Sequence, residues 1–374
     1  MRGSAVLCGF YGRRNLGDEA LLAGLLQALA AAGQPDGHHV LTPAPHAVRA
    51  DHRVAASRWD GTARGRRAAV RDLELTRVLV RHPHFLLGGG DLLRDSPTQD
   101  VAQVWLRPAR LALQLRRRVG VVGVSVGEIH RDDTRRTIRD TLDHCSLVTV
   151  RDDASAAALR DLGVQTPVHV LPDLALSLTA PVDRLLDGRV VLCLRGLADR
   201  AGPVATRALD QALDALADAL RTLPEGTEVQ LVPLRSSPHS FGPVDDDYVA
   251  GLEFLARARL ARPVEVVRHV PDVAALIDLL SRADVVVGMR LHSLVLAVGL
   301  DRPVVGLAYD RKVTGFLDDL GGREAVRPLE DVTAAWLRAC LRTALDQGTR
   351  GYDQSLAQQA QSRSTQLVEL LRAW

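Results

Sequence analysis

The feature that most constrains this chain is a regular alternation of two kinds of segment. Short runs of apolar and β-branched residues, bounded by glycine or proline, alternate with longer amphipathic stretches along all 374 residues. The short runs have the composition of buried strands, and the longer stretches carry apolar residues at helical spacing. This alternation is typical of parallel sheets joined by crossover helices. The expected fold class is therefore α/β, with two doubly wound, Rossmann-like domains facing a cleft.

The pattern places each element and the domain boundary. We expect strands at 4–10, 38–42, 84–88, 120–125, 146–150, 167–171, 189–195, 228–233, 264–267, 284–288 and 303–307. Expected helices cover 18–32, 101–118, 134–145, 153–162, 204–221, 245–260, 272–281, 290–299, 331–346 and 354–373. A segment with proline and glycine punctuation near 177–188 marks the boundary. The expected domains are 1–178 and 186–348, with 349–374 as a C-terminal helix that packs back on the first domain.

Composition excludes several classes of function. The 47 basic and 45 acidic residues are spread along the chain without a basic stripe, which argues against a nucleic-acid partner. No window approaches the ~18 apolar residues of a membrane span, so any membrane contact should be peripheral. The N-terminal apolar run is too short for a signal peptide, and the four cysteines show no zinc-type spacing, so we expect a cytoplasmic protein with reduced cysteines and no metal site. The arginine-rich stretch 64–81 also has helical apolar spacing, which favours a solvated helix face.

Lysine occurs once in the chain, at Lys312, and every other basic side chain is arginine. A compact ammonium in such a chain suggests a site where the planar guanidinium fork does not fit. The alternative is an incidental surface lysine, because surface charges rarely carry a specific role. Lys312 follows an expected strand and lies shortly after Gly-Met-Arg-Leu-His at 288–292, which makes it a candidate for chemistry.

The first glycine-rich segment, 9–22, leads from the first strand into a helix. Gly9, Gly12 and Gly17 let the backbone turn sharply and approach a ligand, while Asn15 and Asp18 can cap the helix or bind hydroxyl groups. Asp18 and Glu19 place negative charge where a phosphate would dock, so a sugar hydroxyl fits better than a phosphate. A tight turn between strand and helix is the alternative.

A second segment, Gly88-Gly-Gly-Asp-Leu-Leu-Arg-Asp, follows the strand at 84–88. Consecutive glycines are costly in chain entropy, so they indicate close approach of the backbone to a ligand or to a packed helix. The sequence does not separate these two readings. Asp91 and Asp95 are candidate ligands for the hydroxyl groups of a sugar acceptor, and Gly89 and Gly90 are candidate contacts beside them.

Two arginines end apolar strands, Arg151 in the first half and Arg195 in the second. A charged residue at such a position is often paired with a neighbouring aspartate. Ligand groups also belong at the carboxyl ends of strands in this architecture. Two such arginines on either side of one cleft would clamp a dianion or a carboxylate.

The segment 284–297 places Arg290 and His292 directly after a strand, and Lys312 follows the next strand in the same way. A lone helical histidine is more often structural than catalytic. Three cations at adjacent strand ends, however, require anions nearby. We therefore expect a small, strongly anionic ligand at this edge.

These motifs, taken in order, resemble the polysaccharide pyruvyl transferase family. The matching segments are Gly-Phe-Tyr-Gly-x-x-Asn-Leu-Gly-Asp-Glu-Ala, Gly-Gly-Gly-Asp-Leu-Leu-Arg-Asp, Val-Thr-Val-Arg-Asp, Gly-Met-Arg-Leu-His-Ser and Ala-Tyr-Asp-Arg-Lys-Val-x-Gly-Phe-Leu, between about residues 5 and 322. The resemblance is strongest to the branch that pyruvylates secondary cell wall polysaccharide, the polymer associated with S-layers. It implies a fold similar to GT-B glycosyltransferases.

The resemblance also implies an activity and residue roles. Such enzymes transfer pyruvate from phosphoenolpyruvate to two hydroxyls of a sugar, forming a cyclic ketal and releasing phosphate, with no cofactor besides this co-substrate. The first domain would hold the acceptor and the second the donor. His292 would be the general acid or base, with Asp18 as an alternative base. Donor ligands would be Arg290, Lys312, Arg151 and Arg195; acceptor contacts would be Asn15, Gly17, Gly89, Gly90 and Asp91.

Two segments depart from the family pattern. Gly123-Val-Ser-Val-Gly replaces the usual Gly-x-Gly-Pro turn, and Pro172-Asp173 reverses the usual order, so Asp173 is left out of the expected site. Two other functions stay open: a GT-B glycosyltransferase that uses a nucleotide sugar, and a non-catalytic carbohydrate-binding protein. The acceptor sugar, its linkage to lipid and the oligomeric state also stay open. A lipid-linked acceptor would draw the protein to the inner face of the plasma membrane.

Overall fold

The computed structural model describes residues 3–34, 36–59, 61, 66–96, 100–183, 188–196, 202–236 and 246–374. They form two compact units. The first comprises Met1–Arg13, Asp18–Leu174 and Ser362–Trp374, and the second comprises Arg14–Gly17 and Ala175–Gln361. Of the expected boundary at 177–188, residues 184–187 lie outside the described part of the chain.

The first unit contains a seven-stranded parallel sheet in the order β3-β2-β1-β4-β5-β6-β7. Its strands are β1 (Ala5–Cys8), β2 (His39–Thr42), β3 (Ala55–Arg58), β4 (His84–Leu93), β5 (Arg118–Val126), β6 (Leu147–Val150) and β7 (Val168–Val170). Its helices are α1 (Leu16–Ala31), α2 (Pro45–His52), α3 (Arg66–Arg81), α4 (Val101–Gln114), α5 (Asp132–Leu142) and α6 (Asp153–Asp161). The order reverses at β1 and β4, as in a doubly wound fold.

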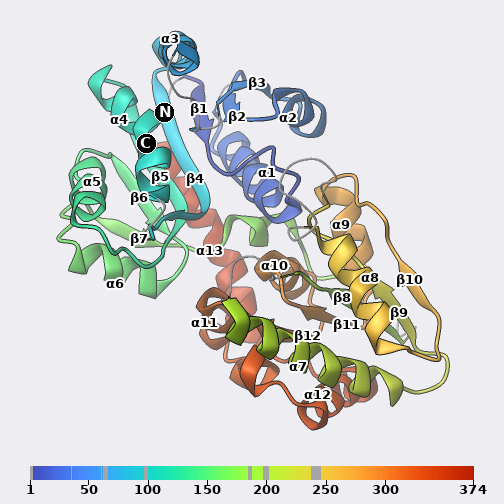
Figure 1. Cartoon of the computed structure of the whole chain (residues 1–374). Helices are drawn as coiled ribbons and strands as arrows, with labels where there is room; N and C mark the ends of the chain where they lie inside the picture. The colour runs from blue at the N-terminus through green and yellow to red at the C-terminus, as the bar shows by residue number, and fades with distance from the viewer. Residues whose placement is uncertain are drawn as a thin grey trace. The chain divides into compact units, whose positions relative to one another are not determined.

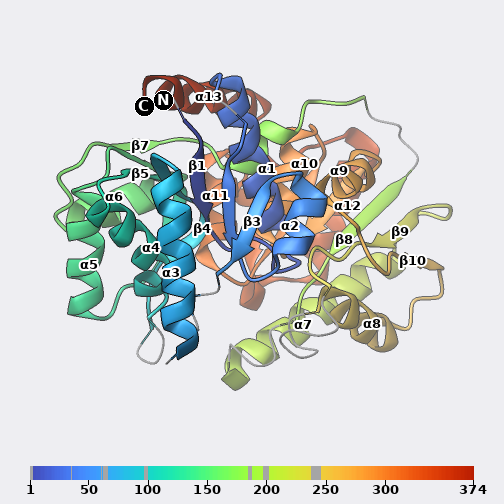
Figure 2. The same ribbon diagram turned by 90° about the horizontal axis from the view of Figure 1, so that it is seen from above.

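Helices cover both faces of this sheet. On one face α1 and α2 pack with the end of α13 (Gln354–Ala373) over a core that includes Leu25, Leu86 and Leu371. On the other face α3, α4, α5 and α6 enclose a second core, in which the rings of Trp59 and Trp105 lie 5.5 Å apart. Figure 2 shows α3 to α6 grouped to one side of the strands, away from α1 and α2.

The sequence predicted that the glycine run follows a strand. In the structure the run lies inside β4 instead. β4 continues through Gly88–Gly90 to Leu93, with positive φ angles of 70° at Gly89 and 90° at Gly90. A Cβ at Gly88 would lie 2.9 Å from the Leu25 side chain, and one at Gly89 would lie 2.8 Å from Cβ of Leu21. Both contacts are to α1. Close packing of a helix on the strand therefore accounts for these two glycines.

The second unit contains a six-stranded parallel sheet in the order β10-β9-β8-β11-β12-β13. Its strands are β8 (Arg189–Cys193), β9 (Glu228–Leu231), β10 (Val264–Val266), β11 (Val285–Gly288), β12 (Val304–Ala308) and β13 (Val326–Pro328). Its helices are α7 (Gly202–Arg221), α8 (Asp247–Ala258), α9 (Val273–Ser281), α10 (Leu291–Gly299), α11 (Arg311–Asp319) and α12 (Ala334–Gln347), with the start of α13.

This sheet is also covered on both faces. α7, α8 and α12 share one core with alternate residues of the strands, such as Val285 and Val287 of β11. Figure 1 shows α7 and α12 side by side. α10 is buried almost along its whole length and packs against β11 and β12. Gly288 of β11 is in register with Cys193 of β8 and with Gly306 of β12, so these three strands end at the same edge of the sheet.

The expected elements are present, with a few corrections. The helix expected at 101–118 ends at Gln114, and Arg118 instead begins β5. The sequence did not predict two edge strands and two short helices, β3, β13, α2 and α11. Among the described residues, no helix combines the length and the hydropathy that crossing a bilayer requires.

The end of α13 belongs to the first unit. Leu371 and Trp374 are buried there, and the indole N–H of Trp374 donates a hydrogen bond of 2.5 Å to the Ser146 hydroxyl. The Trp374 ring lies 5.4 Å from the ring of His84, and the Arg118 guanidinium lies 5.4 Å from its centroid. The last turn of the chain thus completes a core built mainly from residues before 175.

Candidate functional site

Polar side chains gather at the carboxyl edge of the second unit's sheet. They follow four neighbouring strands, β9, β8, β11 and β12. The residues are Arg235 and Asp247 after β9, Arg195 after β8, Arg290 and His292 after β11, and Tyr309 and Lys312 after β12. The carboxyl ends of parallel strands are where doubly wound folds bind ligands.

Arg290 is held by a carboxylate that the sequence did not indicate. Its Nε and Nη2 atoms donate to the two carboxylate oxygens of Asp247 at 3.0 and 2.5 Å. The side chains of Arg290 and Asp247 are 10% and 1% exposed. This two-point contact fixes the plane of the guanidinium, and Asp247 supplies part of the negative charge that the cations require.

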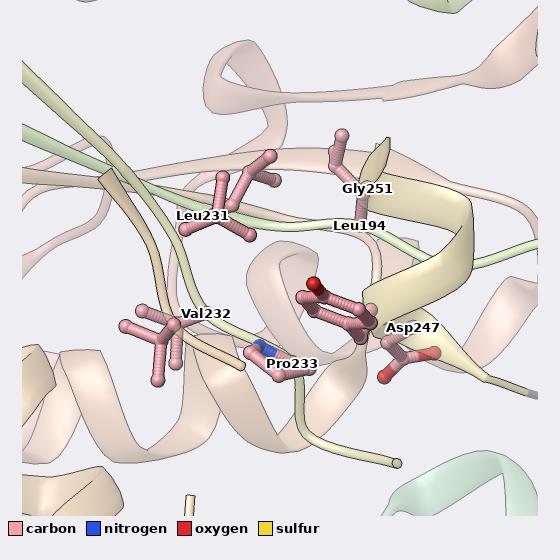
Figure 3. A pocket seen from close by; sticks show the side chains of 9 residues that line it. Leu194, Leu231, Val232, Pro233, Asp247 and Gly251 are labelled. Carbon is pink, nitrogen blue, oxygen red and sulfur yellow. The ribbon is translucent and has the colours of Figure 1, made fainter. Parts of the chain in front are cut away.

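Asp247 is itself fixed by the backbone. It opens α8, and its carboxylate accepts a hydrogen bond of 2.9 Å from the N–H of Arg235. Figure 3 shows its carboxylate turned away from Leu231 and Val232, which line a small pocket beside it. This pocket, of about 10 Å³, has room for about one water molecule and is not the site of a substrate.

Tyr309 lies against two of the cations. The Arg195 guanidinium carbon is 4.3 Å from the centroid of the Tyr309 ring, and Nζ of Lys312 is 5.6 Å from it. Burial, and next the charge of Arg290, lower the pKa of Arg195. Burial acts to raise the pKa of Tyr309, but the charges of Lys312, Arg195 and Arg290 outweigh it, so that the pKa of Tyr309 is lowered. The aromatic ring therefore sits in a strongly positive environment.

Lys312 lies in the first turn of α11 and is partly exposed. Its Nζ is 3.4 Å from Oδ2 of Asp310, while Oδ1 of Asp310 caps the helix by accepting from the Lys312 N–H at 3.1 Å. The Lys312 side chain is 28% exposed, so the ammonium is accessible to a ligand. Arg195, Arg290 and Lys312, arranged around Tyr309, are called the cation cluster below.

His292 has an unusually close neighbour in the segment Arg14–Gly17, which belongs to the same unit. A Cβ at Gly17 would lie 2.3 Å from Nδ1 of the His292 ring. The segment is anchored by an antiparallel bridge between Asn15 and Arg235 and by a hydrogen bond of 2.9 Å from the Leu16 N–H to the Leu234 carbonyl. The structure thus brings together the expected catalytic histidine and the expected contacts Asn15 and Gly17.

Arg151 belongs to the first unit and has a buried partner there. Its Nη1 donates to Asp173 at 2.9 Å and its Nε to the Ser125 hydroxyl at 2.5 Å. Both charged side chains are almost fully buried. Arg151 is thus paired with an aspartate, but the partner is not a neighbouring one, as the sequence suggested; it is Asp173, the residue that departs from the family pattern.

The other expected residues of the first unit surround the start of α1 and the end of β4. A Cβ at Gly90 would lie 3.6 Å from Oδ1 of the buried Asp18. Asp91 is 3.4 Å from Nε of Arg94. Asp95 accepts hydrogen bonds from the backbone N–H groups of residues 130 and 131, so its carboxylate binds the loop that follows β5.

A model of the family described as polysaccharide pyruvyl transferase matches residues 15–311, which is well over half of the chain. The chain belongs to this family. The polysaccharide pyruvyl transferase family consists of enzymes that transfer pyruvate to polysaccharide. The matched residues include the Asn15–Gly17 segment, His292 and the cation cluster apart from Lys312, which directly follows the match. No functionally curated protein matches the chain significantly in sequence.

Solved structures support the fold of this pyruvyl transferase. UDP-GlcNAc 2-epimerase from Methanocaldococcus jannaschii is similar with a TM-score of 0.64 at 11% identity, covering 100% of both chains. UDP-GlcNAc 2-epimerase from Neisseria meningitidis, bound to UDP-GlcNAc, gives 0.62 at 10% identity with the same coverage. The glycosyltransferase VinC, in complex with dTDP, gives 0.50 at 15% identity and 100% coverage of both chains. The expected two-domain, Rossmann-like GT-B fold is confirmed.

Sequence reasoning missed three residues of the candidate site: Asp247, Arg235 and Tyr309. Asp247 stands in a run of three aspartates before a helix, of which one suffices as a cap, so a spare carboxylate was a usable signal. Tyr309 is one of only four tyrosines and directly follows β12. Arg235 gave no signal, because it lies several residues beyond the end of β9 and not at the strand end itself.

Proposed function

We propose that this pyruvyl transferase takes pyruvate from phosphoenolpyruvate and places it on two hydroxyls of one saccharide, forming a cyclic ketal and releasing phosphate. The observation that carries this proposal is the cation cluster at the carboxyl edge of the second unit. Phosphoenolpyruvate bears a phosphate and a carboxylate on a three-carbon frame, so it requires several cations at close range. The buried Arg195 and Arg290 and the accessible Lys312 supply them.

The proposed reaction balances without a cofactor. A proton adds to the methylene carbon of phosphoenolpyruvate, and the central carbon becomes an electrophile that the first sugar hydroxyl attacks. The bond from this carbon to the phosphate oxygen then breaks, and the second hydroxyl closes the ketal. The two sugar hydroxyls release two protons. One returns to the group that protonated the methylene carbon, and the other leaves with the phosphate. Phosphoenolpyruvate is a co-substrate, and no metal takes part in these steps.

The roles follow from chemistry and position. His292 transfers the proton, because its ordinary pKa lies near neutral pH and its ring is held against Gly17. Asp18 is the alternative base. Arg290, Arg195 and Lys312 bind the two anionic groups of the donor, and Arg151 is a further donor contact in the proposal. Asn15, Gly17, Gly90 and Asp91 bind the acceptor hydroxyls, while Gly89 is accounted for by its packing against α1.

We further propose that the acceptor is a precursor of a cell-wall or exported polysaccharide, as in the secondary cell wall branch that the motifs resemble. The protein would then act in the cytoplasm before export of the polymer. The Asn15–Gly17 segment supports a hydroxyl-bearing acceptor. It presents amide and backbone groups beside His292, and none of its side chains is a cation.

A ligand screen tests the donor. Thermal unfolding of the full chain is followed with phosphoenolpyruvate, inorganic phosphate, UDP-GlcNAc and dTDP. Stabilisation by phosphoenolpyruvate beyond that by phosphate supports the proposal, because a bound ligand raises the melting temperature. Stabilisation by the nucleotide ligands alone would overturn it in favour of a glycosyltransferase.

Two variants refine the test. Lys312→Arg keeps the charge and changes its shape, so unchanged donor affinity would show that charge alone is needed. His292→Ala should abolish phosphate release from phosphoenolpyruvate with acceptor while the melting temperature stays close to that of the parent. Near-normal release would remove His292 from the proposed chemistry.

A further inference from the structure

Most of the arginine-rich stretch, which the candidate site does not use, forms α3 (Arg66–Arg81), a helix with exposed apolar residues; residues 64 and 65 lie outside the described part of the chain. Val70, Leu73 and Val80 of α3 are 59%, 52% and 55% exposed. Among the described residues, they are the three most exposed large apolar side chains, and all lie on one helix of the first unit. Single exposed apolar residues are ordinary, but a group on one helix marks an interaction surface.

These residues share one arc of the helix. At 3.6 residues per turn, Val70, Leu73 and Val80 lie within an arc of about 80° around the helix axis. With the exposed Arg77 and Arg81 included, the arc widens to about 100°. The opposite side holds the buried Leu75 and Leu79, which pack into the core of the unit. One exposed carboxylate, that of Glu74, borders the arc.

The inner side of the helix is packed on the unit. Leu75 and Leu79 are buried in its core, and Oδ2 of Asp72 forms an exposed ion pair of 2.5 Å with Nη2 of Arg107 on α4. The exposed arc is therefore presented by a helix already packed on its other side. Binding at this arc needs no unfolding of α3.

We propose that the arc formed by Val70, Leu73, Arg77, Val80 and Arg81 docks on the surface of a membrane that carries anionic phospholipid. Aliphatic side chains interleaved with arginines match a bilayer interface, where chains enter between headgroups and guanidinium groups pair with phosphates. A protein partner is less well matched, because the arc has no aromatic anchor. This inference goes beyond the proposed function and does not depend on it.

Vesicle flotation of the full chain tests the proposal. Vesicles of phosphatidylcholine alone are compared with vesicles in which about a quarter of the lipid is phosphatidylglycerol. We expect the protein to float with the anionic vesicles, to stay behind with the neutral ones, and to be released by high salt. Failure to float with the anionic vesicles would overturn the proposal.

Two variants and a matched control locate the surface. V70S/L73S/V80S and R77Q/R81Q should each lower the bound fraction at least about tenfold, with unchanged melting temperatures. The control V182S/L252S/L356S removes the three other large exposed apolar side chains of the described residues and should bind like the parent. Equal losses in the control would contradict the assignment to α3. The arginine variant keeps the test valid if the triple serine variant unfolds.

A last measurement separates a membrane from a second copy of the chain. If α3 joins two copies, the parent will sediment as a dimer without lipid and V70S/L73S/V80S as a monomer, and the proposal is then wrong. A parent protein that is monomeric without lipid and floats with anionic vesicles supports the membrane proposal.

Discussion

The single lysine of this chain is placed against an aromatic ring. Lys312 and Arg195 both lie close to the ring of Tyr309, at 5.6 and 4.3 Å from its centroid. A guanidinium and an ammonium repel each other, and the electron-rich face of an aromatic ring offsets part of that repulsion. Tyr309 therefore holds the cation cluster together before an anion arrives, and we infer that it is a positioning residue for the donor.

Tyr309 allows the ring and the hydroxyl to be tested separately. Tyr309→Phe keeps the ring, so its KM for phosphoenolpyruvate should stay within about twofold of the parent. Tyr309→Leu removes the ring and should raise this KM about tenfold with a smaller change in kcat, since a desolvated contact of this kind contributes about 1–2 kcal/mol. Steady-state phosphate release measures both constants. Equal losses in the two variants would assign the effect to the hydroxyl instead.

The buried pair between Arg290 and Asp247 predicts a large loss of stability. Asp247→Asn leaves a buried guanidinium without its charge partner, so the free energy of unfolding should fall by about 3 kcal/mol in urea titrations. Asp310→Asn is the matched control, because Asp310 is 40% exposed and asparagine also caps helices. We expect the control to change stability by less than about 1 kcal/mol. A loss in Asp247→Asn no larger than in the control would contradict this account of Arg290.

At the scale of elements, the start of α1 is packed against His292. In Gly17→Ala the new methyl group would overlap the imidazole at 2.3 Å from Nδ1, so the ring or the helix must move. We expect kcat to fall about 100-fold, as a displacement of about 1 Å in an active site can cause. The measurement is phosphate release under saturating donor.

A second glycine provides the control for this substitution. Gly315 lies inside α11 of the same unit, and a Cβ there meets no atom within 4 Å. Gly315→Ala should therefore keep full activity and add about 0.5–1 kcal/mol to the free energy of unfolding. Similar activity losses in both variants would show that the site does not depend on the space at Gly17.

Most of the elements could be predicted from the sequence because buried parallel strands have continuous apolar runs. The two missed strands share a cause. β3 is Ala-Ala-Ser-Arg and β13 is Val-Arg-Pro, and both lie at sheet edges, where side chains are half exposed and the apolar signal is weak. The run Gly88–Gly90 was expected to follow the end of a strand, but β4 continues through it. Gly88 and Gly89 are glycines because α1 packs closely against the strand at these positions.

The candidate site was predictable only in part. Arg195, Arg290, His292 and Lys312 follow strands directly, so topology alone brings them to one edge. Asp247 reaches Arg290 across 43 residues, and Asp173 reaches Arg151 across 22, and no local pattern announces such pairings. The roles of these residues stay predictions, since they depend on ligands and on chemistry rather than on the fold.

At the scale of the whole molecule, two adjacent histidines make stability depend on pH. Burial lowers the pKa of His38, whose Nδ1 accepts the Ala5 N–H at 3.0 Å. Burial, with the charges of His82, Arg49 and Arg81, lowers the pKa of His39 to about 4. Both histidines are neutral in the folded chain at neutral pH, whereas unfolded histidine takes up a proton near pH 6.5. The folded state therefore loses stability as the pH falls from about 6.5 toward 4.

His39→Leu removes one of these titrating groups. The drop in unfolding free energy between pH 7.5 and pH 5 should be smaller in His39→Leu than in the parent, as measured by urea titration. His46→Leu, at an exposed position on α2, should show the full drop. A parent-like drop in His39→Leu would mean that other groups cause the acid sensitivity.

The buried end of α13 has a consequence for how the protein is made. The core of the first unit includes Leu367, Leu371 and Trp374, which the ribosome adds after the whole of the second unit. Domains usually fold in the order of their synthesis. Here the second unit can complete its core while the first still lacks the final turns of its own, so the earlier-made half of the molecule is the later one to mature.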